Sequence, residues 1–487
     1  MQIDSWLAEE MWRKARYLLF VVGFFVTGCF ADVQTVPSTK TQVFNVPPPA
    51  GSTVLGIALS GGGSRAAYFG AAGLKALSGV RTIAEPQALL ERVSYLSSVS
   101  GGSLASSYFA MKKPERDVHV LTHDGSLTAD YSKFFQTYLD TMASNIEYPV
   151  IWKQFYKIRW GHSNQRATSL AEVLDDKFLD GATFQDLYER EKAGHAPRLI
   201  VNATFYNNGR RAAMTTLPST AFNYDFIGQL QTELKKSALP GVSVPPLPPS
   251  LANAQQALIP QTFADLGIDT RVIPLSRAVA ASASFPPLIG PITIQIKDDE
   301  KKVYHHVGDG GLFDNQGTES LVQLLLKMKA EKQIDRALII AFDSSFPFTG
   351  KVDQLNHMEN GFDIFLDDPG RIVGIMEVRA NAYQSALWHT LQAKNIVVPD
   401  DQAFKVIVIK HTDDVWPENW RGLVPSQCAE EQSGWKDKKD LIQHLALVPT
   451  RFKIDSTCDR ALLDKVAQLA VERNQDDILG FLRGQER

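Results

Sequence analysis

The sequence has few cysteines and no excess of charge of either sign. Three cysteines in 487 residues are too few for a disulfide scaffold, and because none pair as CxxC, a structural zinc site is not expected. The 50 basic and 54 acidic side chains give a formal net charge of −4, which provides no bulk attraction for a nucleic acid. With 44% hydrophobic and 21% charged residues, the composition excludes a disordered chain, a coiled coil and collagen.

The region near the N-terminus lacks an apolar run long enough for a permanent transmembrane helix. Basic residues at 13–16 precede an apolar run at 17–26, which as a helix is only about 15 Å long, half of a bilayer's hydrocarbon core. This pattern predicts a signal peptide over residues 1–28. Thr-Gly before Cys29 resembles the lipobox of bacterial lipoproteins, in which the cysteine becomes acylated after cleavage. The alternative is an ordinary signal peptide with an incidental cysteine.

Residues 29–53 are rich in Pro, Ser, Thr and Gln and show no amphipathic period, so they predict a tether. The lipobox resemblance implies that a lipid anchor on Cys29 holds the protein at a membrane surface of the bacterial cell envelope. Phe30 follows the cysteine where an aspartate commonly marks inner-membrane retention, so the same resemblance implies the outer membrane, facing the periplasm.

The rest of the sequence alternates between strand and helix patterns. Apolar runs that predict strands lie at 54–59, 93–99, 199–205, 304–307, 338–342 and 404–409, and helices are predicted at 64–78 and 104–111. This alternation predicts an α/β fold with a mostly parallel central sheet and helices on both faces.

We expect one catalytic domain over 54–412 and a C-terminal extension over 413–487 that caps the core. Two insertions interrupt the domain, an aromatic-rich one at 128–160 and a Pro-rich loop at 240–260, and the aromatic side chains are expected to be core rather than lipid-facing. In an exported protein Cys428 and Cys458 could form a disulfide; two buried free thiols are the alternative.

Three small-residue motifs follow predicted strands: Ser-Gly-Gly-Gly-Ser-Arg at 60–65, Ser-Val-Ser-Gly-Gly at 98–102, and Gly-Asp-Gly-Gly at 308–311. The second resembles the nucleophile elbow G-x-S-x-G, with Ser98 in place of the first glycine and Ser100 as nucleophile. The helix that follows favours negative charge at Ser100 through its N-terminal dipole.

Consecutive backbone N–H groups in the glycine triplet, at a helix N-terminus, predict an anion-binding loop. A Walker-type phosphate loop requires Lys-Ser/Thr after its last glycine, whereas this sequence has Ser64 and Arg65, so nucleotide binding is not favoured. In a hydrolase the same N–H groups stabilise the oxyanion of a tetrahedral intermediate.

Together these motifs resemble the patatin-like phospholipases, which are related to the catalytic domain of cytosolic phospholipase A2. Further matches lie at 202–204, 209–210 and 280–287. The resemblance implies a patatin-like three-layer fold and a lipid acyl hydrolase, of phospholipase A or lysophospholipase type, that takes membrane lipids as its substrate. It implies a Ser-Asp dyad of Ser100 and Asp309 that acts through an acyl-enzyme.

The resemblance also implies an oxyanion hole of Gly61, Gly62 and Gly63, with Arg65 either orienting the loop or binding the phosphate of a lipid. No cofactor and no metal are expected, since no acidic cluster has calcium-loop spacing and His305 and His306 point to opposite faces of a strand.

Two alternative functions remain open. Ser100, Asp343 and His411 follow the Ser-acid-His order of an α/β-hydrolase-type esterase. A non-catalytic, anchored lipid-binding protein is the other possibility. Headgroup, acyl position, acyl transfer and oligomeric state are not determined by the sequence.

Overall fold

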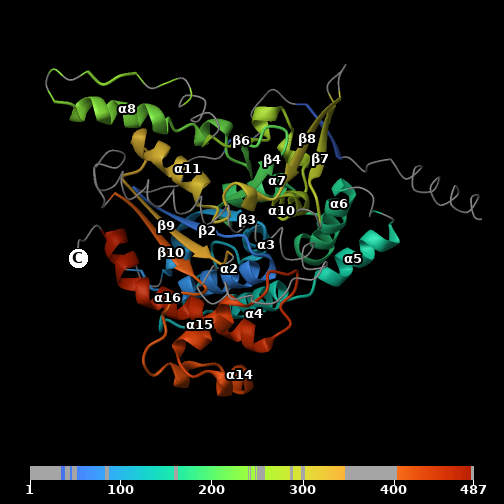
Figure 1. Cartoon of the computed structure of the whole chain (residues 1–487), viewed down its shortest axis with the longest axis vertical. Coiled ribbons are helices and arrows are strands. Elements are labelled where there is room, and N and C mark those ends of the chain that lie inside the picture. The colour runs from blue at the N-terminus through green and yellow to red at the C-terminus, as the bar shows by residue number, and fades with distance from the viewer. Residues whose placement is uncertain are drawn as a thin grey trace, which may run out of the picture.

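Ten strands of the described residues form one sheet, which is the centre of the fold (Figure 1). The computed structural model describes residues 34–38, 44–45, 52–82, 87–157, 159, 163–239, 241, 243–246, 248, 250, 258–285, 289–297, 302–345 and 403–483. The predicted signal peptide, Cys29 and most of the expected loop at 240–260 lie outside these residues.

The strands run in the order β1-β7-β8-β4-β3-β2-β9-β10, with β5 beside β4 and β6 beside β5. Strands β4, β3, β2, β9 and β10 are parallel to one another, whereas β8 is antiparallel to both of its neighbours. The bounds are β1 (Gln34–Pro37), β2 (Thr53–Leu59), β3 (Val93–Val99), β4 (Arg198–Phe205), β5 (Arg211–Thr215), β6 (Gln261–Thr262), β7 (Ile292–Lys297), β8 (Lys302–Gly308), β9 (Arg336–Asp343) and β10 (Phe404–Lys410).

Helices cover both faces of this sheet, as the alternating pattern predicts. The α-helices are α2 (Gly63–Ser78), α3 (Gly101–Lys112), α4 (Ala129–Met142), α5 (Glu147–Tyr156), α6 (Ser163–Leu174), α7 (Phe184–Lys192), α8 (Phe226–Ser237), α10 (Leu275–Ser282), α11 (Thr318–Ala330), α14 (Ala429–Gly434), α15 (Lys438–Ala446) and α16 (Thr457–Arg483). The prediction of a mixed α/β fold with a mostly parallel central sheet is confirmed.

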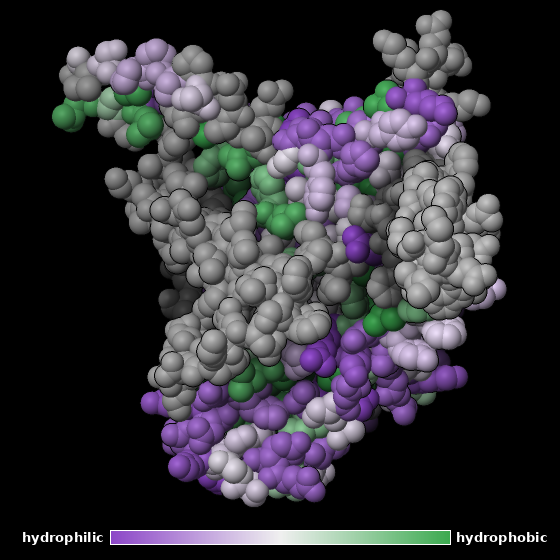
Figure 2. Space-filling model, turned by 45° about the vertical axis from the view of Figure 1, so that its right-hand side comes forward, coloured by the Kyte–Doolittle hydropathy of each residue, from purple (hydrophilic) through white to green (hydrophobic). Residues whose placement is uncertain are grey.

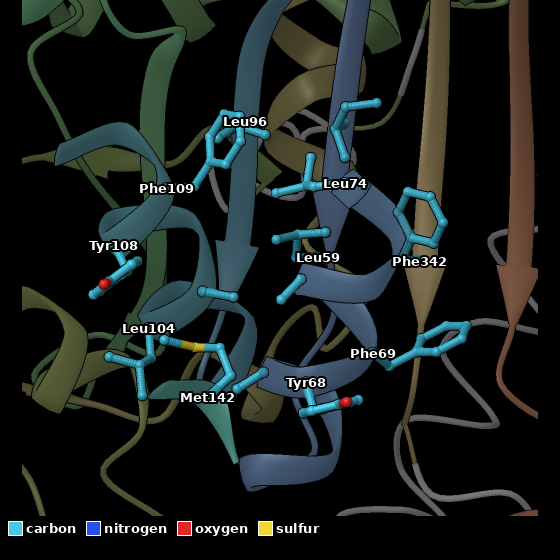
Figure 3. Close-up of a cluster of buried hydrophobic side chains, with 14 of the residues drawn as sticks. Leu59, Tyr68, Phe69, Leu74, Leu96, Leu104, Tyr108, Phe109, Met142 and Phe342 are labelled. Carbon is cyan, nitrogen blue, oxygen red and sulfur yellow. The ribbon is translucent and has the colours of Figure 1, made fainter. Parts of the chain in front are cut away.

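The core is divided in two by the sheet because successive side chains of a strand point to opposite faces. In β2, Leu55, Ile57 and Leu59 belong to the larger cluster, with α2 and α3, while Val54 and Ala58 belong to the smaller one, with α11. Figure 3 shows part of the larger cluster, where side chains of α2 and α3 meet those of β2, β3 and β9. Burial on both faces explains why these strands read as continuous apolar runs.

Helix α2 lies close to the sheet because small residues face it. A Cβ added at Gly70 would lie 3.2 Å from the Leu59 side chain, and one added at Gly73 would overlap the ring of Phe342. Larger side chains at these positions would push the helix away from β2 and β9. That close approach fixes where the N-terminus of α2, and with it the glycine triplet, sits relative to the strand ends.

One part of the expected tether belongs to the sheet instead. Gln34–Pro37 pairs in parallel with β7, and Val36 is buried in the larger core cluster. The prediction of a tether is therefore wrong for these four residues. A four-residue edge strand is too short to show an alternating pattern, so its pairing could not be recognised.

The aromatic insertion at 128–160 splits into two helices with different environments. On α4, Tyr131, Phe134, Phe135 and Tyr138 are buried, and the Tyr138 hydroxyl donates to the Ala105 carbonyl at 2.7 Å. The expectation of core aromatics is confirmed there. It is wrong for α5, whose aromatic side chains are exposed. No helix among the described residues is long and apolar enough to cross a membrane.

The C-terminal segment packs against the sheet and its helices. Helix α16 lies along α2 and also contacts β9 and β10, and Figure 2 shows that the surface at this end of the molecule is mostly hydrophilic. Cys428 and Cys458 form a disulfide with a sequence separation of 30 residues, which joins the start of α16 to the turn before α14.

Replacing both cysteines with serine is expected to lower the free energy of unfolding by about 3 kcal/mol, because the cross-link removes loop-closure entropy from the unfolded chain. Chemical denaturation of the double variant beside the untreated wild type measures this loss. A single Cys428→Ser variant serves as the control for burial of a free thiol at Cys458, and equal stability of wild type and double variant would contradict the prediction.

Candidate active site

Ser100 occupies the turn between β3 and α3 in a strained backbone conformation. Its φ of 51° and ψ of −119° lie in a region that side-chain-bearing residues rarely adopt. The Ser100 carbonyl accepts hydrogen bonds from the N–H groups of Ser103 (2.9 Å) and Leu104 (3.3 Å), so the helix begins directly at Ser100. A Cβ at Gly101 would overlap the Gly63 carbonyl, which explains the need for glycine after Ser100. This is the geometry expected of a nucleophile elbow.

The serine in place of the elbow's first glycine is accommodated by hydrogen bonds. Ser98 is fully buried, and its hydroxyl accepts a hydrogen bond from Ser106 at 2.6 Å and lies 3.4 Å from the Ile200 carbonyl. A small side chain whose hydroxyl has partners therefore fits the turn as well as glycine does.

Ser282 holds the backbone of the nucleophile in place. Its hydroxyl oxygen accepts the Ser100 N–H at 2.8 Å, donates to the Asn202 carbonyl at 2.5 Å and lies 3.0 Å from the Ser103 hydroxyl. The sequence motifs around Asn202 and Ser282 indicated family resemblance but not this role. The bonds link α10 and β4 to the strained turn, and so stabilise a conformation that is costly by itself.

Asp309 follows β8 and is buried, with 4% of its surface exposed. Its Oδ1 accepts the Gly311 N–H at 2.7 Å, and its carbonyl accepts the Thr204 hydroxyl at 2.8 Å. Burial raises the pKa of the Asp309 carboxyl to about 7, against the opposing effect of the Gly311 hydrogen bond. A carboxyl with a pKa near neutrality can both accept and return a proton, which is what a general base and acid must do.

Strand β4 separates the two candidate catalytic residues. Val99 is paired with Asn202 on one side of β4, and Gly308 is paired with Thr204 on the other. Ser100 and Asp309 therefore leave the sheet at the same level, two strand spacings, or about 10 Å, apart at the backbone. Side chains that point toward each other can bridge most of such a distance.

The glycine loop lies beside Ser100, but its three N–H groups are not equivalent. The N–H of Gly61 donates to the Asn315 carbonyl at 2.8 Å and is therefore occupied. Gly62 and Gly63 have φ values of 133° and 62°, and no hydrogen bond from their N–H groups occurs within the described part of the chain. The expected oxyanion hole of three glycines is thus reduced to Gly62 and Gly63, and Gly63 lines the same pocket as Ser100.

Asn315 joins the three sequence motifs, a contact that no sequence pattern indicated. A Cβ at Gly61 would overlap the Asn315 amide oxygen and lie 3.4 Å from the Cβ of Ser100, and a Cβ at Gly311 would lie 2.8 Å from the same amide oxygen. Both glycines therefore leave room for one asparagine side chain. The glycine loop, the elbow and the Asp309 turn meet around it.

Arg65 does not face the pocket. Its side chain is 1% exposed and donates to the Ser344 carbonyl at 2.8 Å and to the Val448 carbonyl at 2.6 Å. The prediction that Arg65 binds substrate is therefore wrong for this structure, and the other reading, that it orients the glycine loop, agrees with these bonds. A guanidinium with several donors can fasten the start of α2 to the end of β9 and to the C-terminal segment at once.

An apolar pocket of about 330 Å³, including space open to solvent, adjoins Ser100. The glycine loop and elbow form one wall. The others come from α3, the residue before α5, α6, α10 with the residue after it, and the C-terminal segment: Leu104, Ile146, Leu170, Leu174, Val279, Ala283 and Phe452. The apolar lining suits contact with hydrocarbon rather than with a charged group.

The alternative triad is not assembled. The Asp343 carboxylate accepts hydrogen bonds from the Gln316 amide (3.0 Å) and the Ser345 N–H (2.9 Å) rather than from a histidine. His411 is buried against the ring of Phe69, and desolvation lowers the pKa of its imidazole well below the usual range. A histidine kept neutral in this way is a structural residue of the core.

Metal ligands are not grouped in the part of the chain that the structure describes: no cluster of three or more His, Cys, Asp or Glu residues occurs there. His306 lies 2.9 Å from the Thr293 hydroxyl, while His305 packs against the ring of Phe205. The two histidines therefore have separate partners, His306 on β7 and His305 on β4.

The model of the patatin-like phospholipase family matches residues 57–322, which contain the glycine loop, Ser100 and Asp309. The chain belongs to the patatin-like phospholipase family. The segment at 413–483, which contributes Phe452 to the pocket, lies outside the family match.

Two solved structures similar to this patatin-like protein are of human GIVD cytosolic phospholipase A2. One shares 12% identity at a TM-score of 0.45, covering 89% of this chain and 60% of that chain. The other, in complex with methyl gamma-linolenyl fluorophosphonate, shares 14% identity at a TM-score of 0.38, covering 89% and 59%. This chain thus spans about 60% of the length of these structures. No curated protein has a matching sequence.

The rate of ester hydrolysis is expected to rise with pH through about 7, because only the ionised carboxylate of Asp309 can accept a proton and burial raises its pKa to that value. A profile of kcat/KM from pH 5 to 9 on a neutral, monomeric ester measures this limb. A profile that is flat between pH 6 and 8 would contradict the assignment of Asp309 as base.

Proposed function

We propose that the protein hydrolyses carboxylic esters of membrane lipids as a phospholipase A or lysophospholipase, through a Ser100–Asp309 dyad. The observation that carries this proposal is the strained Ser100 at the wall of an apolar pocket, across β4 from a buried carboxyl with a pKa of about 7. Family membership supports the lipid ester as substrate.

The reaction begins when Ser100 Oγ attacks the ester carbonyl carbon and its proton passes to the Asp309 carboxylate. The N–H groups of Gly62 and Gly63 stabilise the oxyanion that forms. The carbon–oxygen bond to the alcohol then breaks, and Asp309 returns the proton to the leaving oxygen. Water attacks the acyl-enzyme with Asp309 again as base, the fatty acid leaves, and Ser100 recovers its proton.

The lining of the pocket favours recognition of the acyl chain over the headgroup. Its walls are mainly apolar, and Arg65, the nearest basic residue of the glycine loop, is bonded to the Ser344 and Val448 carbonyls. Selectivity for the headgroup is therefore expected to be weak compared with selectivity for chain length.

A fluorophosphonate probe tests the proposal against its alternatives. The wild type is expected to form a covalent adduct at Ser100 and to release fatty acid from phosphatidylcholine, and Ser100→Ala to do neither. Absence of labelling of the folded wild type would favour a non-catalytic lipid-binding protein. Loss of activity in a folded His411→Gln variant would favour the Ser100–Asp343–His411 triad instead.

We also propose that Cys29 carries a lipid anchor that keeps the catalytic domain at the outer membrane, facing the periplasm. The basic residues, short apolar run and Thr-Gly-Cys sequence support this. Cys29→Ser is expected to abolish incorporation of labelled fatty acid and to move the protein from the membrane to the soluble fraction, with unchanged activity on dispersed substrate. Normal processing and unchanged membrane fractionation of the variant would refute the anchor.

A further inference from the structure

Helix α5 exposes its apolar side to solvent, the reverse of what a surface helix of a globular protein does. Its stripe of exposed residues has the spacing i, i+3, i+4, i+7 and i+8: Tyr148, Ile151, Trp152, Phe155 and Tyr156. Trp152 is 60% exposed and Tyr156 80%. This spacing places all five on one face of the helix. We call these five residues the α5 stripe.

The opposite side of α5 carries the polar contacts. Gln154 is buried, Lys153 pairs with Asp176 at 2.6 Å, and Lys157 pairs with Glu172 at 2.8 Å. Figure 1 shows α5 beside α6, to which Glu172 belongs. Because its two lysines are already paired, the helix offers an apolar and nearly uncharged face to whatever binds it.

The stripe begins where the active-site pocket ends. Ile146, the residue that precedes α5, lines the pocket with Ser100, and its N–H donates to the Phe452 carbonyl at 3.0 Å. Phe452 lines the same pocket. The first turn of α5 is thereby fixed to the pocket wall, so a surface that rests on the stripe lies next to the entrance to Ser100.

A bilayer fits this face better than a second copy of the chain. A ten-residue helix is about 15 Å long and about 10 Å wide, so its exposed face has an area of about 150 Å². Each partner in a stable protein complex buries roughly 800 Å², which is far more. Tyr and Trp are the side chains that favour the boundary between lipid headgroups and acyl chains, since each has an apolar ring and a polar tip.

We propose that the α5 stripe docks the protein on the surface of a zwitterionic bilayer and so places a lipid ester at the pocket beside Ser100. The inference rests on the proposed function for its substrate, and adds to it the surface that the enzyme binds. Docking is apolar rather than electrostatic, so it requires no anionic lipid.

The test uses the full chain with Cys29→Ser in every variant, so that the proposed anchor does not contribute, and with Ser100→Ala where binding is measured. A Trp152→Ser/Phe155→Ser variant is expected to bind phosphatidylcholine vesicles at least about tenfold more weakly. Its rate on those vesicles is expected to fall in proportion, while hydrolysis of a short-chain ester below its micellar concentration is retained.

Leu234→Ser/Leu239→Ser provides the matched control. Both leucines are exposed apolar residues in or directly after α8, the arm at the upper left of Figures 1 and 2, away from α5. This variant is expected to bind and act on vesicles like its parent. An equal loss in both variants would overturn the assignment of docking to α5.

Three other results would also overturn docking. The first is vesicle binding that requires phosphatidylserine or disappears in high salt. The second is a dimer in sedimentation experiments without lipid that Trp152→Ser/Phe155→Ser converts to a monomer. The third is a parent protein that does not bind phosphatidylcholine vesicles although it hydrolyses the monomeric ester. A failure of the proposed function is distinguishable, because the monomeric ester would then not be hydrolysed either.

Discussion

Ser100→Ala is expected to lower kcat/KM for ester hydrolysis by about 10⁴-fold or more, because the substitution removes the hydroxyl proposed to attack the carbonyl carbon. The fold is expected to remain, since the alanine keeps the Cβ and the backbone bonds to Ser282 and Ser103 involve no hydroxyl of Ser100. Steady-state kinetics with circular dichroism measure both. Ser107→Ala, at a buried serine of α3 with no hydrogen-bond partner for its hydroxyl among the described residues, is the control.

Asp309→Asn is expected to lose activity to a similar extent, and the Ser100→Ala/Asp309→Asn double variant to lose little more than either single variant. When two residues act as one unit, either substitution alone already removes most of the rate enhancement, so the second substitution lowers the rate little further. Losses that multiply in the double variant would refute the dyad, as would a Ser107→Ala variant as inactive as Ser100→Ala.

The same carboxyl lowers the stability of the protein at neutral pH. Because the pKa of Asp309 is raised from 3.8 to about 7 in the folded state, the folded protein binds more protons than the unfolded chain between these values. The contribution of Asp309 to the free energy of unfolding therefore falls as the pH rises from about 4 to about 7. The Asp309→Asn variant is accordingly expected to have a free energy of unfolding higher by on the order of 1–3 kcal/mol at pH 8, measured by chemical denaturation.

An element could be predicted from the sequence where one short segment contains the whole pattern that identifies it. The strand at 93–99 was predicted with the bounds of β3, because a buried run that ends in glycines is complete within about ten residues. The positions of Ser100 and Asp309 directly after strands were predicted for the same reason, and their catalytic roles remain a proposal. The family match covers all three motifs.

Partners distant in the chain could not be predicted in this way. An arginine is a common ligand of phosphate, so the sequence allowed Arg65 that role. Its structural role depends on hydrogen bonds to Ser344 and Val448, which are 279 and 383 residues away in the chain. The occupation of the Gly61 N–H by Asn315 is similarly non-local. The aromatic residues of α4 and α5 have similar composition, and tertiary packing alone buries one set and exposes the other.

The C-terminal segment positions the glycine loop from outside the family match. The Arg451 carbonyl accepts the Ser64 N–H at 2.7 Å, and the Val448 carbonyl accepts the Arg65 guanidinium at 2.6 Å. Two adjacent residues of the loop are thus fastened to one turn between α15 and α16. Gly63, the residue before Ser64, lines the pocket with Ser100, and its N–H has no hydrogen-bond partner among the described residues.

Gly63→Ala is therefore expected to lower kcat by about 10²- to 10³-fold with little change in KM, the loss typical of one displaced oxyanion donor. The φ of Gly63 is 62°, which alanine adopts at a cost of about 1–2 kcal/mol, but its Cβ would lie 2.5 Å from the Arg451 carbonyl oxygen. Either the loop or the Arg451 turn has to move, and in both cases the N–H leaves its position beside Ser100.

Gly181→Ala separates this effect from backbone strain. Gly181 has a similar φ of 77°, and an added Cβ there meets no atom within 4 Å. It is expected to lose about the same stability with full activity. If Gly63→Ala, folded by circular dichroism, keeps a wild-type kcat, the N–H of Gly63 does not stabilise the oxyanion. We also expect the fluorophosphonate to label Ser100 more weakly in Gly63→Ala than in Gly181→Ala, because the phosphonate oxygen occupies the site of the oxyanion.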